Sequence, residues 1–144
     1  MPKPENKPQV RIIRKAALAL FRDKKIIMGR DNKNDEVFIM IGGKVEEGET
    51  DQQCLIREVK EEIEVDVKPD SIKFLTEFTG PAHGKSNDVM LNIKLYEAEI
   101  VGEPKTTDEI VEIQYFDSTT DHKHISEIGQ TQIFPWLKSH GYIN

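Results

Sequence analysis

The chain has 144 residues, a length that suits one domain. Charged residues make up 32% of it and the net charge is −6, which argues against a broad nucleic-acid-binding surface, since such a surface needs a basic footprint. No run of about 18 apolar residues is present, so no membrane-spanning helix is expected. The single cysteine, Cys54, excludes an internal disulfide, favours a cytoplasmic protein, and is interpreted as a small buried hydrophobe.

Residues 1–8 contain three prolines, and no apolar segment follows that would make them a secretory signal. They predict a disordered lead-in, with one domain over residues 9–144. Val10–Phe21 is rich in Ile, Ala and Leu and predicts a strand. A charged turn and a second strand, Lys25–Gly29, follow, so the two strands are predicted to form a hairpin. Val37–Ile41 predicts a short strand that runs into two glycines.

The next segment predicts a helix. Thr50 and Gln53 resemble a capping box with Thr50 at the N-cap, and the helix is expected to run to about Ile63. At roughly 100° per residue, its apolar side chains fall within one arc: Leu55, Ile56, Val59 and Ile63. Three acids, Glu58, Glu61 and Glu62, fall on the neighbouring arc. They therefore lie at the edge of the buried face, where the lip of a site would be.

The second half of the chain predicts strands followed by helix. The expected elements are strands at Ile72–Phe78, Val89–Ile100 and Ile113–Phe116, a loop at Gly80–Gly84, and a helical segment at Ile125–His140. Pro135 is expected to divide this last segment into two pieces, and Gly141 suits the position after a helix end. Strands mixed with two helical segments predict an α+β or α/β sandwich.

The three acids carry the strongest chemical signal. Spacings of three and four residues place Glu58, Glu61 and Glu62 on one turn, where like charges repel unless positive charge lies among them. Mg²⁺ suits such a site, because it prefers carboxylate oxygens and keeps some of its waters. The alternative is that paired glutamates are ordinary solvated surface. However, these acids lie in the C-terminal half of the helix, where the helix dipole disfavours negative charge.

The acids belong to a longer pattern: Gly43, five residues, Glu49, seven residues, Arg57-Glu58-Val59-Lys60-Glu61-Glu62, one residue, Glu64-Val65. This resembles the Nudix box, G-x5-E-x7-R-E-U-x-E-E-x-G-U with U aliphatic, at every specified position except Glu64, where the box has glycine. Ile41-Gly42-Gly43-Lys44 is similar to the Pro-Gly-Gly-Lys that leads into the box, with Ile41 in place of proline. If Glu64 adopts the left-handed backbone that glycine favours, the cost is roughly 1 kcal/mol; alternatively the helix ends differently and Glu64 is helical or extended.

The resemblance implies a Nudix-type α/β/α sandwich around a mixed β-sheet and a role for each matching residue. It implies Glu58 and Glu62 as metal ligands, Glu61 as a further ligand or part of the water-activating set, and the Gly42 or Gly43 carbonyl as an added ligand. Arg57 is expected to orient a glutamate, either Glu49 or Glu61. An acid outside the box often completes such sites, and Glu109 is the first candidate for it, ahead of Glu112. Lys44 and Gly43 are candidate substrate contacts, although Lys44 suits a plain surface lysine equally well.

The implied activity is hydrolysis of a nucleoside diphosphate linked to another moiety, with Mg²⁺ or, as a substitute, Mn²⁺. The substrate is a small nucleotide, and the small size resembles the MutT-like nucleoside triphosphate pyrophosphohydrolases. Alternatives are hydrolysis of ADP-ribose, a nucleotide sugar or a dinucleoside polyphosphate, or nucleotide binding without turnover. Retention of every box glutamate favours an enzyme. A homodimer stays open.

Overall fold

The computed structural model describes residues 11–33, 36–82 and 88–144, so the predicted lead-in at residues 1–8 lies outside the described residues. The elements in chain order are β1 (Arg11–Ala19), β2 (Phe21–Arg22), β3 (Lys25–Asp31), β4 (Phe38–Met40), β5 (Gly42–Lys44), α1 (Asp51–Ile63), β6 (Asp66–Val67), the 3₁₀ turn η1 (Pro69–Ser71), β7 (Lys73–Pro81), β8 (Val89–Glu97), β9 (Ile100–Val101), β10 (Ile110–Phe116), the π-helical turn η2 (Gly129–Ile133) and α2 (Phe134–Ser139). The predicted mixed α+β class is confirmed.

The strand β1 is the centre of the first sheet, whose order is β5-β1-β8-β7. It pairs in parallel with β8, from Arg11 opposite Val89 to Ala19 opposite Glu97, and antiparallel with β5. The sheet is therefore mixed, as expected. The edge strand β7 runs antiparallel to β8 and contains a bulge.

The second sheet is antiparallel, with the order β10-β3-β2 and with β4 also paired to β3. The predicted hairpin is wrong for most of its first strand, because β1 ends at Ala19 and belongs to the first sheet. Only Phe21 and Arg22 fold back on β3. Asp23 and Lys24 form the turn with φ values of 51° and 55°, the positive angles that a tight two-residue hairpin turn requires. A short third sheet pairs β6 with β9.

Several strand limits differ from the sequence prediction. Gly80 and Pro81, expected in a loop, are the last residues of β7 and pair with Leu91 and Met90 of β8. A proline is tolerated there because β7 is an edge strand. The remainder of that predicted loop lies largely outside the described residues. The long strand expected to reach Ile100 is split into β8 and β9.

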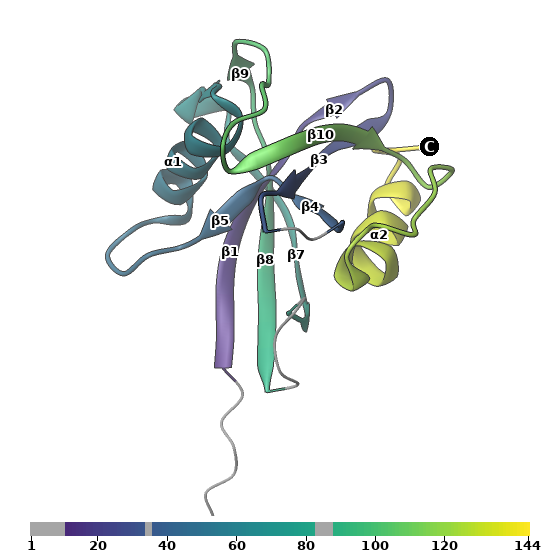
Figure 1. Cartoon of the computed structure of the whole chain (residues 1–144). Coiled ribbons are helices and arrows are strands. Elements are labelled where there is room, and N and C mark those ends of the chain that lie inside the picture. The colour runs from purple at the N-terminus through teal and green to yellow at the C-terminus, as the bar shows by residue number, and fades with distance from the viewer. Residues whose placement is uncertain (1–10, 34–35, 83–87) are drawn as a thin grey trace, which may run out of the picture.

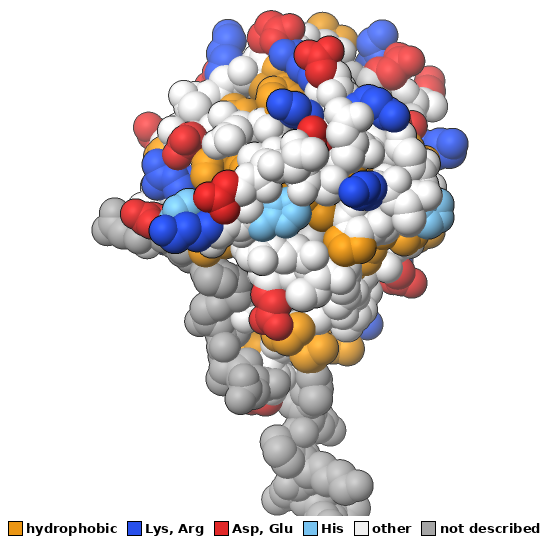
Figure 2. All heavy atoms as spheres, turned by 90° about the vertical axis from the view of Figure 1, so that its right-hand side faces the viewer, with side chains coloured by type: hydrophobic (Ala, Val, Ile, Leu, Met, Phe, Trp, Pro, Cys, Tyr) orange, Lys and Arg blue, Asp and Glu red, His pale blue; other side chains and the backbone are white. Residues whose placement is uncertain are grey.

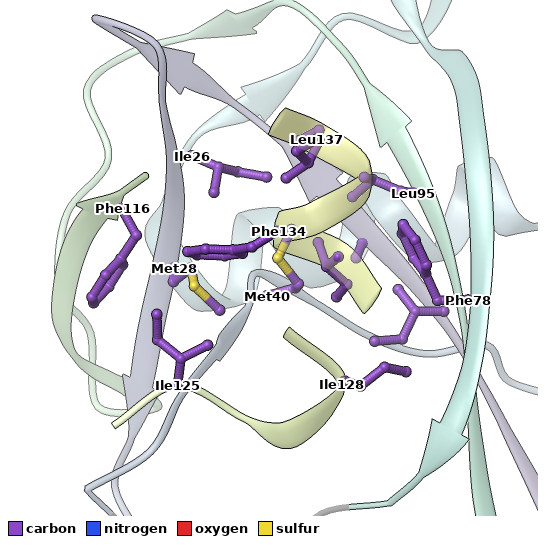
Figure 3. Packing of buried hydrophobic residues seen from close by; sticks show 14 of the residues in the cluster. Ile26, Met28, Met40, Phe78, Leu95, Phe116, Ile125, Ile128, Phe134 and Leu137 are labelled. Atoms are coloured by element: carbon purple, nitrogen blue, oxygen red, sulfur yellow. The ribbon is translucent and has the colours of Figure 1, made fainter. Parts of the chain in front are cut away.

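The two α-helices lie at opposite sides of the sheets (Figure 1). Successive side chains of β1 point to opposite faces of the sheet. Ala16 and Leu18 belong to the buried cluster under α1, whereas Ala17 and Ala19 belong to the buried cluster under α2. Phe134 of α2 projects into the second cluster and lies near Met28 and Met40 (Figure 3). Small side chains on the central strand thus allow a core on each face.

The C-terminal helical segment is one run rather than two separate pieces. The π-helical turn η2 continues directly into α2, and the Phe134 amide donates to the Gly129 carbonyl five residues back. Pro135 follows directly after η2, whose π-type hydrogen bonds already interrupt the regular i→i−4 pattern that a proline inside a helix would break. Gly141 follows α2 with φ of 79°, as its position predicted.

Figure 2 shows the α2 side of the molecule. Acidic and basic side chains are interspersed on this face, and hydrophobic side chains form small separate groups. This face therefore carries no continuous basic field of the kind that nucleic-acid binding needs. Within the described residues, no helix has the length and apolar character to cross a membrane.

Candidate active site

The helix α1 is fixed in register at both ends. At its start the Thr50 hydroxyl accepts the Gln53 amide at 3.1 Å, and the Gln53 side chain accepts the Thr50 amide at 3.0 Å, which is the predicted capping box. The apolar face is buried against the sheet through Leu55, Val59 and Ile63. This orientation places the acids of the same helix along the edge of that buried face.

Two glycines of β5 let α1 approach the sheet closely. Gly42 has φ of 143°, a conformation that other residues rarely adopt, and a Cβ there would collide with the Ala16 carbonyl of β1. A Cβ on Gly43 would overlap the carboxyl group of Glu58. The pair therefore brings the backbone of β5 directly against the acids of α1.

Glu62 is the most buried of these acids, with 8% of its surface exposed. Its Oε1 accepts the Gly42 amide at 2.7 Å. Burial raises the pKa of Glu62 to about 7, the nearby Lys15 and the Gly42 amide act in the opposite direction, and the charges of Glu58 and Glu109 raise it further. Glu62 is thus a carboxylate held against the backbone and surrounded by other acids.

Arg57 bridges Glu49 and Glu58, two acids of the motif. Its guanidinium donates to both oxygens of Glu49, at 2.8 and 2.9 Å, and to Oε1 of Glu58 at 2.7 Å. It lies 3.6 Å from Glu61. These bonds, together with the Glu46 amide, hold the pKa of Glu49 down to about 2. The predicted bridge is therefore made to Glu49, and Arg57 also fixes the direction of Glu58.

Glu61 and Glu109 line one cleft. Residues 105–109 pack on the end of α1, where the Lys105 amide donates to the Ile63 carbonyl at 3.0 Å. The open cleft between them has a volume of about 910 Å³ and is lined by Lys60, Glu61, Glu64, Lys105, Thr106, Thr107, Asp108 and Glu109. Glu112, the second candidate, forms an ion pair with Arg30 at 3.0 Å instead. The structure therefore brings Glu109, and not Glu112, to the acids of α1.

The other predicted contacts differ in their surroundings. Lys44 is exposed at the end of β5, opposite Lys15 of β1. Three phenylalanines belong to the core under α2 and are therefore not free to stack on a nucleotide base: Phe38, Phe78 and Phe116. Trp136 is half-buried, and its ring stacks with His140 at 4.0 Å and with Tyr142 at 5.7 Å.

Sequence reasoning missed Lys15. Its Nζ donates to the Met40 carbonyl at 3.0 Å, and burial lowers its pKa although Glu62, Glu58 and Asp31 favour the charged form. A signal was present, because Lys15 interrupts the apolar pattern of β1 on the same strand face as Ala17. Lys15 supplies the positive charge that the acid cluster was expected to need.

The donor set suits a hard divalent cation, since it consists of carboxylates and backbone carbonyls. In the part of the chain that the structure describes, no three His, Cys, Asp or Glu side chains converge tightly enough to form a ready metal site. Glu58 is turned to Arg57 and Glu62 to the Gly42 amide. The donor chemistry therefore fits Mg²⁺, and binding would require these carboxylates to reorient.

The comparisons with known proteins agree on one family. A family model described as the NUDIX domain matches residues 12–137. A nudix hydrolase family member from Chromobacterium violaceum has a TM-score of 0.70 and 21% identity, covering 95% of this chain and 80% of that chain. The MutT NUDIX hydrolase from Burkholderia pseudomallei has a TM-score of 0.69 and 18% identity, with coverage of 83% and 94%.

A UDP-X diphosphatase is also similar, with a TM-score of 0.67 and 18% identity over 90% of this chain and 64% of that chain. At such identities the likeness to solved structures concerns the fold. A search of curated proteins finds no significant match. Hydrolases of the matched family generally use divalent metal ions.

Proposed function

This chain belongs to the Nudix family of hydrolases, which act on phosphoanhydride bonds, and we propose that it hydrolyses a nucleoside diphosphate linked to another moiety with the aid of Mg²⁺. The observation that carries the proposal is the contact between β5 and α1. Gly42 and Gly43 leave no Cβ in the way, so Glu58 and Glu62 lie against the backbone of β5. An ordinary solvated acidic helix would have no reason to bury Glu62.

Each residue has a proposed task. Glu58, Glu61, Glu62 and the Gly42 or Gly43 carbonyl would hold Mg²⁺, which neutralises phosphate oxygens and lowers the pKa of a bound water. Arg57 holds Glu58 in place through a charge-assisted bond. Glu61, 46% exposed at the cleft, is suited to directing the attacking water.

Two further residues are proposed to act close to the bound substrate. Glu109 completes the acid set from the other wall of the cleft, and Lys44 contacts a phosphate from its exposed position on β5. We favour a nucleoside triphosphate as substrate, with release of pyrophosphate, as in MutT-like enzymes. The similar UDP-X diphosphatase makes a nucleotide sugar the second candidate. We place this activity in the cytoplasm, because the one cysteine is a free, buried thiol.

A substrate panel with Mg²⁺ or Mn²⁺ tests the activity. Nucleoside triphosphates, nucleotide sugars, ADP-ribose and dinucleoside polyphosphates are compared by the phosphate, pyrophosphate and nucleoside monophosphate they release. We expect release of pyrophosphate from at least one nucleoside triphosphate, and its loss on removal of the metal. Metal-independent hydrolysis, or binding of nucleotides without hydrolysis, would contradict the proposal.

Substitutions test the site. Glu58→Gln and Glu62→Gln should each reduce turnover by orders of magnitude in a folded protein, because each removes a charged oxygen ligand. Glu109→Gln should also reduce turnover, whereas Glu112→Gln is the matched control and should remain close to the original chain. Unchanged turnover in Glu62→Gln would remove that residue from the site.

A further inference from the structure

One hydroxyl group joins the end of α1 to the opposite wall of the cleft. The Thr107 Oγ1 donates to the Glu62 carbonyl at 2.8 Å, and it accepts the Glu109 amide at 3.2 Å and the Ile110 amide at 3.1 Å. The Thr107 amide in turn donates to the Ile110 carbonyl at 2.9 Å. A hydroxyl has one donor and two acceptor positions, so all of them are used here.

This arrangement gives the helix end an unusual partner. The last four carbonyls of a helix lack partners within the helix. At the end of α1, the Thr107 hydroxyl donates to the Glu62 carbonyl, and the Lys105 amide donates to the Ile63 carbonyl. Residues 105–110 are therefore attached to the residue that carries the most buried acid, and not merely packed near it.

The attachment determines where Glu109 lies. The Glu109 amide bonds to the same oxygen that bonds to the Glu62 carbonyl, so a short path of hydrogen bonds connects the two backbones. The Glu109 side chain lines the cleft together with Glu61. Within the described residues no salt bridge holds the exposed Glu109 side chain, so its position depends on its backbone.

We propose that Thr107 is a positioning residue of the active site, whose hydroxyl holds Glu109 in register with Glu62 so that acids from both walls of the cleft can serve one divalent ion. This proposal rests on the proposed function only in assuming that the acids bind metal. It assigns Thr107 no contact with substrate.

Mn²⁺ binding to the full chain, measured by calorimetry and by water-proton relaxation, tests the proposal without a substrate. Thr107→Val removes the hydroxyl at nearly constant shape and should weaken Mn²⁺ binding by roughly 10-fold to 100-fold, the usual effect of losing a group that orients metal ligands. Thr107→Ser keeps the hydroxyl and should restore binding. Thr131→Val removes a hydroxyl that donates to the Glu127 carbonyl at 2.8 Å, outside the residues that line the cleft, so it is the matched control and should bind as the original chain does.

Two further readouts separate positioning from a general loss of structure. In the metal-free protein, the amides of Glu109 and Ile110 should exchange faster in Thr107→Val, while amides in the middle of α1 are unchanged. A double-mutant cycle should show coupling, so that Thr107→Val adds little to the loss already caused by Glu109→Gln. If Thr107→Val does not fold at the assay temperature, Thr107→Ala replaces it.

The outcomes are distinct. Full Mn²⁺ affinity in a folded variant that lacks the hydroxyl, or additive losses in the cycle, would overturn the role of Thr107. If the original chain binds Mn²⁺ in a Thr107-dependent manner but hydrolyses no nucleotide, the proposed function fails and the role of Thr107 stands. If it binds no Mn²⁺, both fail.

Discussion

Cys54 is a buried thiol that the proposed chemistry does not use. Its side chain is fully buried on α1 and donates to the Gly43 carbonyl at 3.3 Å. Burial raises the pKa of Cys54 to about 12, so the nucleophilic thiolate is scarce at neutral pH. The sequence interpretation of Cys54 as a small buried hydrophobe is confirmed.

Replacing Cys54 should therefore leave turnover nearly intact. Cys54→Ala removes only a weak donor to Gly43, and water rather than a thiolate is the proposed nucleophile. The steady-state rate per folded molecule, set beside a thermal melt, measures the effect. A folded Cys54→Ala or Cys54→Ser protein without activity would show that the mechanism has been misassigned.

Lys15 is expected to stabilise the metal-free protein. Lys15→Met leaves the Met40 carbonyl without its donor and removes the cation beside Glu58 and Glu62, so the free energy of unfolding should fall by about 1–3 kcal/mol. Mg²⁺ should recover part of the loss, because the ion takes over neutralisation of the acids. Urea unfolding with and without Mg²⁺ measures this. Lys44→Met, opposite Lys15 but exposed, is the control and should change little.

The end of α1 departs from the box at a position with a demanding backbone. Glu64 follows the last helical residue with φ of 57° and ψ of 35°, and its amide donates to the Lys60 carbonyl at 3.1 Å. Of the two conformations that the sequence left open, the structure shows the left-handed one. Glycine enters this region without strain from a Cβ.

Glu64→Gly should therefore raise the free energy of unfolding by about 1 kcal/mol, because it removes the left-handed penalty. Glu64→Ala keeps a Cβ and should show no comparable gain. Metal dependence and turnover should be unchanged in both, since Glu64 is proposed to have no part in binding the ion. Chemical denaturation and a Mg²⁺ titration of activity provide the measurements. A collapse of turnover in Glu64→Gln would instead place its carboxylate in the site.

The local sequence pattern predicted the helix α1 well, but it predicted poorly which distant residues and strands come into contact. The capping residues, the apolar arc and the acid spacing all lie within one short segment, so the helix and its acids could be read directly from the sequence. Lys15 and Thr107 could not, because their roles depend on Met40 and on Glu62, which are distant in sequence. The hairpin prediction failed for the same reason: β1 finds better partners in β5 and β8 than in the strand that follows it.

The molecule as a whole should lose stability in acid through Glu49. Its folded pKa of about 2 lies below the ordinary value of 4.5, so its contribution is complete above pH 4.5 and is lost as the pH falls towards 2. Glu62 acts over a different pH range. Because its folded pKa of about 7 lies above the ordinary value of 4.5, it lowers the stability of the metal-free protein as the pH rises from 4.5. Glu49 binds Arg57 and the Glu46 amide, so its effect reaches the whole loop before α1.

Unfolding by urea at a series of pH values measures this contribution. Glu49→Gln should show a shallower fall in stability between pH 4.5 and 2 than the original chain. Identical slopes would mean that the Glu49 carboxylate has the same proton affinity in the folded and unfolded chain, contrary to its bonds with Arg57.

The parallel pairing of β1 with β8 determines when this protein can become active. During synthesis, β1 emerges early, yet its partner begins only at Val89. Contacts between segments so distant in sequence form slowly, and until they form, the unpaired backbone groups along the edge of β1 can pair with other chains. Gly42 pairs with Ala17 on this same strand, so the two glycines of β5 have no fixed scaffold beforehand. A nascent chain should therefore gain its hydrolase activity late, after β8 has left the ribosome.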